Sequence, residues 1–169
     1  HDHARARAKE AADLVASLGP AFIKAGQALS TRPDIVPPLL LEELAGLQDQ
    51  LPGFDSALAM ACIEEDLGAP IASIYAELER EPISAASLGQ VHRGVLLNGE
   101  KVAVKVQRPN LPTILRRDLV IIRLLAVVSA PLLPLNLGFG LGDIIDEFGS
   151  TLFEEIDYRF EANNAERFA

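Results

Sequence analysis

Two segments of the sequence determine how the fold of this chain can be predicted: Ser84-Ala85-Ala86-Ser87-Leu88-Gly89-Gln90-Val91 and, after it, Val102-Ala103-Val104-Lys105. The first segment has the frame of the phosphate-binding loop G-x-G-x-x-G-x-V, with Ser84 and Ala86 at the places of the first two glycines. The second segment fits V-A-I-K, a strand whose lysine binds the α- and β-phosphates of a nucleotide. The two motifs in register predict a nucleotide-binding hairpin.

The residues between the motifs predict how the hairpin folds. Asn98-Gly99 separates two strand-like runs, 91–97 and 100–107, and it favours a two-residue type I′ turn because both positions need a positive φ. The period of two in the second strand places its valines on one face and Lys101, Ala103, Lys105 and Gln107 on the other. We therefore expect a valine core face and a site face on which Ala103 contacts adenine and Lys105 binds phosphate. An ordinary amphipathic hairpin with a solvated lysine is the alternative.

The expected cofactor is ATP or ADP, bound by both motifs. The predicted contact residues are Ser84, Ala85, Ala86, Ser87, Gly89, Val91, Ala103 and Lys105. No H-R-D-x-x-x-x-N loop and no D-F-G triplet occurs in the sequence, and in kinases these supply the catalytic base and the Mg²⁺ ligands. His92-Arg93-Gly94 and Glu147-Phe148-Gly149 are interpreted as coincidences. Mg²⁺ is therefore expected only with a C-terminal lobe that the chain lacks, and the chain alone is expected to be inactive and to hold no metal.

Further motifs extend this prediction over nearly the whole chain. They are K-x-G-Q within Phe22-Ile23-Lys24-Ala25-Gly26-Gln27, its continuation Ser30-Thr31-Arg32-Pro33-Asp34, the E-x-D triplet Glu155-Ile156-Asp157, and Glu161. Together with the alanine-rich loop at 84–87, these motifs resemble the UbiB/ADCK family of atypical protein kinases. The resemblance implies an atypical kinase-like ATPase that supports the biosynthesis of ubiquinone or a related prenyl quinone.

The resemblance also implies roles for the family motif residues Lys24, Gly26, Gln27, Glu155 and Asp157. The K-x-G-Q helix would lie over the nucleotide pocket, where a protein kinase admits its protein substrate. Glu161 is similar to the helix αC glutamate that pairs with the strand lysine, so Lys105 and Glu161 are the expected catalytic residues. Glu155 would lie on another side of the same helix and pair with Lys24. The alternatives are a solvated acidic helix face and a solvated lysine.

Glycine and proline punctuation divides the chain into helices, a hairpin and further helices. Helices are predicted at about 4–18, 20–30, 38–48, 55–67, 112–130 and 143–168, with Asp143 as the last N-cap, and strands near 76–83, 88–97 and 100–107. This order predicts an α+β fold, the small antiparallel sheet of a kinase-like N-lobe packed with N-terminal and inserted helices. The predicted domains are a helical extension, 1–70, and the N-lobe, 71–169. Both ends look cut, so a C-lobe is expected beyond them.

Composition limits the remaining function classes. The net charge of −9 argues against nucleic-acid binding, because neutralising phosphates needs clustered Lys and Arg. Cys62 is the only cysteine and lies in an apolar helical run, so it is interpreted as a buried, unreactive thiol in a reducing compartment. No secretory signal is present, and a cytoplasmic location is expected.

The apolar stretch 119–141 leaves a second function class open. Arg123, Pro131 and Pro134 interrupt it, so it is not expected to span a bilayer. It nevertheless carries many apolar side chains, which favours peripheral contact with a membrane surface or a prenyl-quinone lipid. The alternative function is therefore a non-catalytic helical module that binds a prenyl lipid or a membrane partner. Under the first prediction, the partners are the nucleotide and the C-lobe of the same protein.

Overall fold

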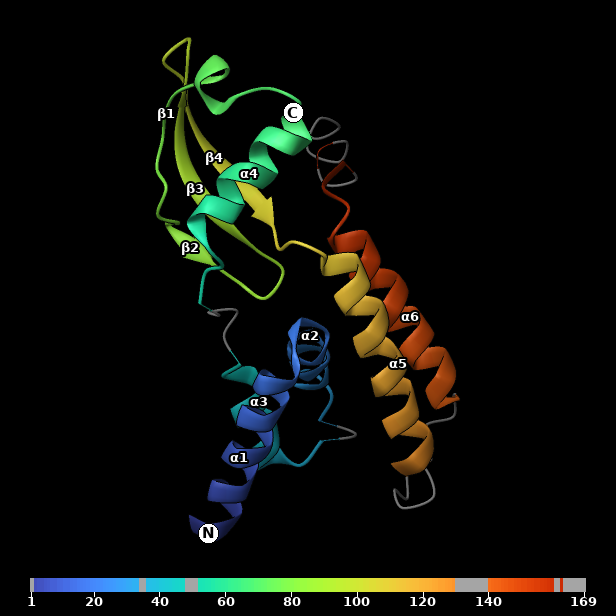
Figure 1. Cartoon of the computed structure of the whole chain (residues 1–169). Coiled ribbons are helices and arrows are strands. Elements are labelled where there is room, and N and C mark those ends of the chain that lie inside the picture. The colour runs from blue at the N-terminus through green and yellow to red at the C-terminus, as the bar shows by residue number, and fades with distance from the viewer. Residues whose placement is uncertain (1, 34–35, 48–51, 130–139, 160–161, 163–169) are drawn as a thin grey trace. The chain divides into compact units, whose positions relative to one another are not determined.

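The computed structural model describes the chain apart from residues 1, 34–35, 48–51, 130–139, 160–161 and 163–169. The chain packs as two compact units, unit 1 with His1–Leu47 and Pro112–Ala169, and unit 2 with Gln48–Leu111. Helices together with a small antiparallel sheet confirm the predicted α+β fold (Figure 1). Packing joins the first and last parts of the chain in unit 1, whereas the sequence predicted a linear boundary near residue 70.

The sheet of unit 2 is antiparallel and centres on β3. Its strands are β1 (Tyr75–Leu78), β2 (Ser84–Ala85), β3 (Gly89–Leu96) and β4 (Lys101–Gln107). Strand β4 pairs with one edge of β3, and β1 and β2 pair with successive parts of the other edge. The short strand β2 therefore holds the start of the predicted phosphate-binding loop beside the central strand (Figure 1).

The two faces of β4 differ as the period of two predicted. Its valines are buried or half-buried, and the residues exposed on the opposite face are Lys101, Ala103 and Lys105. Val106 belongs to a core cluster with Ala59 and Ile63 of helix α4 (Ser56–Leu67). Helix α4 therefore packs on the valine face, and Lys105 lies on the face away from this core.

The hairpin turn differs from the predicted type I′ turn. Asn98 is not among the residues with a positive φ, whereas Gly99 has a φ of 87°. Leu96 N–H donates to Glu100 O (2.8 Å), and Gly99 N–H donates to Leu96 O (2.8 Å). The loop therefore has three residues and closes with a left-handed glycine. Asn-Gly marked the place of the turn correctly, but the predicted turn type was wrong because this pair fits both geometries.

Helix α4 has well-formed ends. At its start, Asp55 Oδ1 accepts a hydrogen bond from Leu58 N–H (2.9 Å), and at its end Gly68 has a left-handed φ of 64°. A single 3-10 turn, η1 (Ile71–Ser73), then leads towards β1. These signals explain why this helix agrees closely with the predicted range 55–67.

Cys62 lies on α4 at the edge of the sheet core and is half-buried. Burial raises the pKa of its thiol, and the nearby carboxylates of Asp66 and Glu65 raise it further. The thiolate is the reactive form of cysteine. The raised pKa therefore favours the unreactive thiol, although the side chain is less buried than the sequence predicted.

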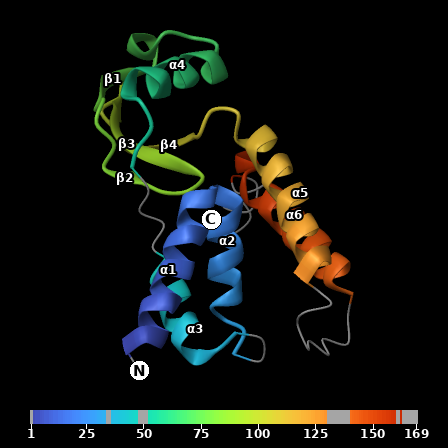
Figure 2. The same ribbon diagram turned by 60° about the horizontal axis from the view of Figure 1, so that its bottom comes forward.

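Unit 1 is helical throughout its described secondary structure. Its helices are α1 (Asp2–Leu18), α2 (Pro20–Leu29), α3 (Pro38–Ala45), α5 (Leu111–Ser129, whose first residue belongs to unit 2) and α6 (Leu141–Glu155). Ala12, Val36 and Leu44 form a core cluster between α1 and the α3 region. Helices α5 and α6 lie side by side, with Leu119 packed against Gly149 (Figure 2). Within the described ranges, none of the helices has both the length and the apolar content needed to cross a membrane.

Helix α6 is shorter than the predicted range 143–168. Gly140 is its N-cap, and Asp143 lies in its first turn instead of capping it. Beyond Glu155, Asp157 N–H donates to Glu154 O (3.1 Å), and Asp157 Oδ1 accepts from Arg159 N–H (3.1 Å). A side chain that bonds a nearby backbone N–H competes with helix continuation. The helix therefore ends at Glu155, and Asp157 lies outside it.

Candidate functional site

One row of residues crosses three strands on the exposed face of the sheet. Val91 of β3 lies opposite Lys105 of β4 and opposite Ser84 of β2. Cross-strand partners share a face, with Cβ atoms about 4.5–5.5 Å apart. Ala103, two residues before Lys105, is exposed on the same face. The structure therefore places the lysine beside the start of the loop, which is the arrangement that the two motifs in register predicted.

The loop between β2 and β3 is closed by its own backbone. Ala85 pairs with Gln90 in the sheet, and Ala86 N–H donates to Gly89 O (2.8 Å). Ser87, Leu88 and Gly89 are buried. The Ala86 N–H is thus used inside the loop, so phosphate binding there would depend on the amides that follow it.

Arg108, which lies outside both sequence motifs and was not predicted as a site residue, contacts this loop from the end of β4. Its Nε donates to Ala86 O (3.3 Å) and Ser87 O (3.0 Å). Its backbone N–H donates to Leu88 O (3.0 Å). Burial lowers the pKa of the guanidinium, but arginine in proteins stays protonated at neutral pH. The one sequence signal for this role is a long cationic side chain directly after the strand that carries Lys105.

His92 has a structural role inside β3, as expected if His92-Arg93-Gly94 is a coincidental match. The side chain is buried, and its Nδ1 lies 2.9 Å from Glu79 O. Because a carbonyl can only accept, Nδ1 carries the proton and Nε2 accepts from Gln90 Nε2 (3.0 Å). Gln90 Oε1 in turn accepts from Phe54 N–H (2.9 Å). This chain of hydrogen bonds joins the segment before α4 to the central strand. Glu147-Phe148-Gly149 lies within helix α6.

The K-x-G-Q residues lie on α2 in unit 1. Lys24 Nζ is 2.6 Å from Oε1 of Glu155, the last residue of α6, which confirms the expected contact. The Lys24 side chain is 17% exposed and the Glu155 side chain is 40% exposed. Gln27 Nε2 donates to Leu47 O (3.0 Å). The polar residues of the motif thus connect α2 with α6 and with the segment after α3.

Gly26 of the motif packs against apolar side chains, not against another backbone. A Cβ built at Gly26 would lie 2.8 Å from Leu47 Cδ1, 3.2 Å from Val15 Cγ1 and 3.3 Å from Leu44 Cδ2. Contacts of this kind leave no room for a methyl group unless Leu47 moves. The glycine therefore allows α2 to pack closely against α1 and the α3 region.

We expect Gly26→Ala to lower the free energy of unfolding by about 1 kcal/mol. Overpacking costs about 1–3 kcal/mol, which exceeds the gain of about 1 kcal/mol in helix propensity. Urea unfolding of the full-length protein measures the change. Gly142→Ala on α6 is the matched control, because its Cβ would meet only Arg123 Nη2 at 3.6 Å. A Gly26→Ala protein as stable as the Gly142→Ala protein would mean that Leu47 moves aside without cost.

Of the two remaining acidic motif residues, the structure describes Asp157 but not Glu161. Glu161 lies outside the described residues, so its pairing with Lys105 stays a prediction. Asp157 follows the end of α6 and accepts a backbone hydrogen bond from Arg159. The predicted helix 143–168 included both Glu155 and Asp157, but α6 ends at Glu155, so the two residues do not share one helix.

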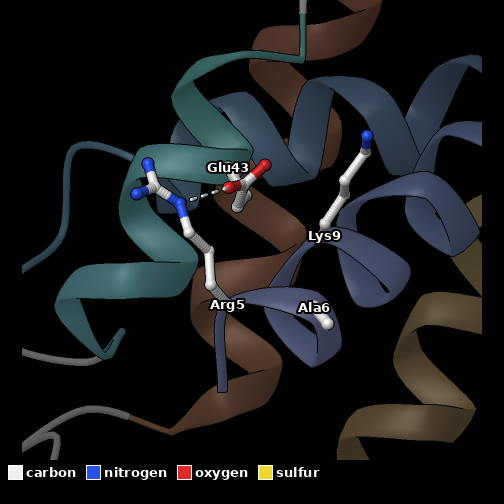
Figure 3. A pocket seen from close by; sticks show the side chains of 4 residues that line it. All are labelled: Arg5, Ala6, Lys9 and Glu43. Carbon is white, nitrogen blue, oxygen red and sulfur yellow. Dashed lines mark ion pairs between the residues drawn. The ribbon is translucent and has the colours of Figure 1, made fainter. Parts of the chain in front are cut away.

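A separate depression, with a volume of about 430 Å³, lies on unit 1 and involves none of the predicted site residues. It is lined by Arg5, Ala6, Lys9 and Glu43 (Figure 3). Arg5 Nε lies 3.7 Å from Glu43 Oε1, so the two charges partly compensate each other. Among the residues that the structure describes, no group of three or more His, Cys, Asp or Glu side chains could hold a metal ion.

The sequence of this chain is similar to a known protein family and to several longer proteins. Residues 46–169 match the ABC1 atypical kinase-like domain. An uncharacterized protein of Synechocystis sp. is 56% identical over 98% of this chain and 29% of its own length. The chloroplastic protein ACTIVITY OF BC1 COMPLEX KINASE 1 of Arabidopsis thaliana is 46% identical over 96% of this chain and 24% of its own length. The chain thus spans about a quarter of the length of these relatives.

A solved structure is also similar to this chain. The Mycobacterium tuberculosis protein Rv3197, determined in complex with erythromycin, aligns with a TM-score of 0.54 and 30% sequence identity. The alignment covers 85% of this chain and 36% of that protein. The fold described above is therefore found in a solved protein of related sequence.

Proposed function

Because the chain belongs to the UbiB/ADCK family, whose members carry the ABC1 atypical kinase-like domain, we propose that its sheet unit binds an adenine nucleotide, ATP or ADP. The observation that supports this most strongly is the row Ser84, Val91 and Lys105 across β2, β3 and β4. It joins the loop and the cation on one exposed face, away from the core under α4. Calorimetric titration of the full-length protein with ATP and ADP tests the proposal, and absence of binding would overturn it.

Each part of the site has a distinct role in this proposal. The Lys105 ammonium binds the phosphates as a point charge. The small Ala103 side chain leaves space for the flat adenine ring on the same face of β4. The amides of the alanine-rich loop add hydrogen bonds to phosphate oxygens. By its similarity to the helix αC glutamate, Glu161 would orient Lys105, and Mg²⁺ would bind through ligands from the rest of the full-length protein, as in kinases.

The K-x-G-Q residues of the helical unit indicate which reaction the bound nucleotide would undergo. The contact between Lys24 and Glu155 holds the K-x-G-Q helix α2 within unit 1, and the family resemblance implies that this motif excludes a protein substrate from the nucleotide. The full-length protein would then act as an atypical kinase-like ATPase that supports ubiquinone or prenyl-quinone biosynthesis. ATP hydrolysis without transfer to a protein acceptor, measured on the full-length protein, is the expected activity.

We expect Ala86→Gly to raise the affinity of the full-length protein for ATP roughly threefold or more, a change of about 0.7 kcal/mol. The Ala86 methyl group stands next to the Ser87 peptide group, and its removal lets phosphate approach that backbone more closely. Calorimetric titration with ATP measures the change. Ala76→Gly is the control, because Ala76 is exposed on β1, which pairs with the other end of β3. Equal or weaker ATP binding by Ala86→Gly would show that the methyl group does not limit access.

A second function is favoured by the surface of α5. Its exposed apolar residues are Val120, Ile121, Leu124, Leu125, Val127 and Val128. Such a stripe is typical of a helix that meets a membrane surface or a lipid, and a non-catalytic lipid-binding module would need no nucleotide. Sedimentation of the full-length protein with lipid vesicles distinguishes the two functions when it is combined with nucleotide titration. Vesicle binding without nucleotide binding would favour this alternative.

A further inference from the structure

We propose that Arg108 is a positioning residue, which fixes two peptide groups of the alanine-rich loop so that their N–H groups point towards the nucleotide. The inference rests on the proposed nucleotide binding and deepens it. It assigns a role to a residue outside both motifs. Arg108 does not contact the nucleotide in this proposal but acts through the loop.

The guanidinium makes a dense set of hydrogen bonds to carbonyl groups. Nε donates to Ala86 O and Ser87 O, and Nη2 donates to Ala86 O (3.2 Å) and Pro52 O (2.8 Å). Two consecutive carbonyls of the loop are therefore directed at one cation. The planar guanidinium of arginine carries several donors in fixed directions, so one side chain can reach the carbonyl oxygens of Pro52, Ala86 and Ser87 together. Lysine has no such planar set of donors.

The direction of these carbonyls determines the direction of the next amides. A peptide group is planar and trans, so its C=O and N–H point in opposite directions. The carbonyl of Ala86 belongs to the same peptide group as the Ser87 N–H, and the carbonyl of Ser87 to the same group as the Leu88 N–H. Since both carbonyls point at the guanidinium, both N–H groups point away from it. Successive N–H groups turned to one side form the kind of backbone site that binds anions.

The positive charge behind the loop strengthens this arrangement. Each of the two peptide dipoles has its carbonyl end at the guanidinium and its N–H end on the opposite side. Ser87 and Leu88 are buried, at 0% and 7% exposure, so a phosphate reaches their N–H groups only after the covering residues move aside. It would then meet dipoles that are already aligned. Burial lowers the pKa of the guanidinium, but arginine keeps its charge at neutral pH.

The guanidinium is itself held in place by the segment before α4. Its Cζ lies 5.7 Å from the centre of the Phe54 ring, within the range of a cation–π contact. Phe54 N–H is fixed by Gln90 Oε1. Gly53 allows this close approach, because a Cβ there would lie 2.9 Å from Gln90 Oε1 and 3.2 Å from Pro82 Cγ. Arg108 therefore connects residues 52–54 with the loop, and both lie in unit 2.

The test compares Arg108→Lys with Arg80→Lys in the full-length protein. Lysine keeps the charge but lacks the planar fork, and Arg80 is an exposed arginine of the same unit outside the proposed site. We expect Arg108→Lys to weaken ATP and ADP binding about tenfold, equal to about 1.4 kcal/mol, and Arg80→Lys to change it less than about twofold. Hydrogen exchange of the 84–91 peptide without nucleotide should be faster in Arg108→Lys than in the parent.

The outcomes separate this inference from the proposed function. If the parent binds no nucleotide, both are overturned. If the parent binds and Lys105→Met does not, while Arg108→Lys retains the parental Kd, only the inference is overturned. A lower melting temperature of Arg108→Lys with an unchanged Kd would also overturn it, because that result indicates a purely structural residue. If Arg108→Lys fails to fold, hydrogen exchange of the parent decides: nucleotide should protect the Ser87 and Leu88 amides, and unchanged exchange there would contradict the role.

Discussion

Lys105→Met in the full-length protein is expected to remove most of the thermal stabilisation that ATP or ADP gives to the parent. Loss of a charge-assisted contact costs about 1.5–3 kcal/mol, which raises Kd about 10- to 150-fold. A nucleotide present at 100 times the parental Kd stabilises the fold by about 2.7 kcal/mol, and a 100-fold weaker Kd leaves about 0.4 kcal/mol. Methionine keeps most of the apolar stem, so the fold itself should change little.

Lys101→Met is the matched control for this prediction. Lys101 is exposed on the same face of β4, but it lies opposite Val95 near the turn, about 13 Å along the strand from Lys105. Its replacement removes the same charge from the same face at a position away from the loop. Equal nucleotide-induced shifts in parent, Lys101→Met and Lys105→Met proteins would mean that Lys105 does not bind the phosphates.

The second large effect is expected for the contact between Lys24 and Glu155. Glu155→Gln should lower the free energy of unfolding by about 2 kcal/mol. This value lies between about 3–5 kcal/mol for breaking a buried pair and about 0–1 kcal/mol for an exposed one, because Lys24 is mostly buried and Glu155 is 40% exposed. Lys24→Met should cost less, since the remaining carboxylate can be hydrated. The double variant should cost less than the sum of the single changes, because each of them already breaks the contact.

The pair Arg123 and Asp146 provides a control within the same unit. Its Nη1–Oδ1 distance is 2.7 Å, nearly the same as in the Lys24 pair, but both side chains are more than half exposed, at 55% and 58%. A double-mutant cycle by urea unfolding should therefore give about 1–2 kcal/mol of coupling for Lys24 and Glu155 and below about 1 kcal/mol for the control. Equal coupling in both pairs would mean that Lys24 behaves as an ordinary surface lysine.

In the hairpin, the sequence alone predicted the core face and the position of Lys105 but not the type of turn. Alternation along β4 predicted which residues face the core, because a strand has a strict period of two, and the motif spacing predicted that Lys105 lies near the loop. The turn type was not predictable in this way. Asn-Gly suits both a two-residue and a three-residue loop, and the choice depends on the pairing of Leu96 with Glu100.

Contacts that depend on tertiary packing were harder to predict. The partner of Lys24 was found because acidic residues are concentrated near Glu155, but the end of α6 was missed because Asp157 forms a local hydrogen bond that helical periodicity does not show. Arg108 was missed for a different reason. Its acceptors are backbone carbonyls of Pro52, Ala86 and Ser87, and backbone groups leave no signature in a sequence.

A structure of the full-length protein with ADP bound tests the central claim most directly. We predict phosphate oxygens within hydrogen-bonding distance, about 2.7–3.2 Å, of Lys105 Nζ and of the Ser87 or Leu88 amide, with adenine beside Ala103. ADP bound elsewhere on the protein, or in this place with Lys105 turned away from the phosphates, would contradict it.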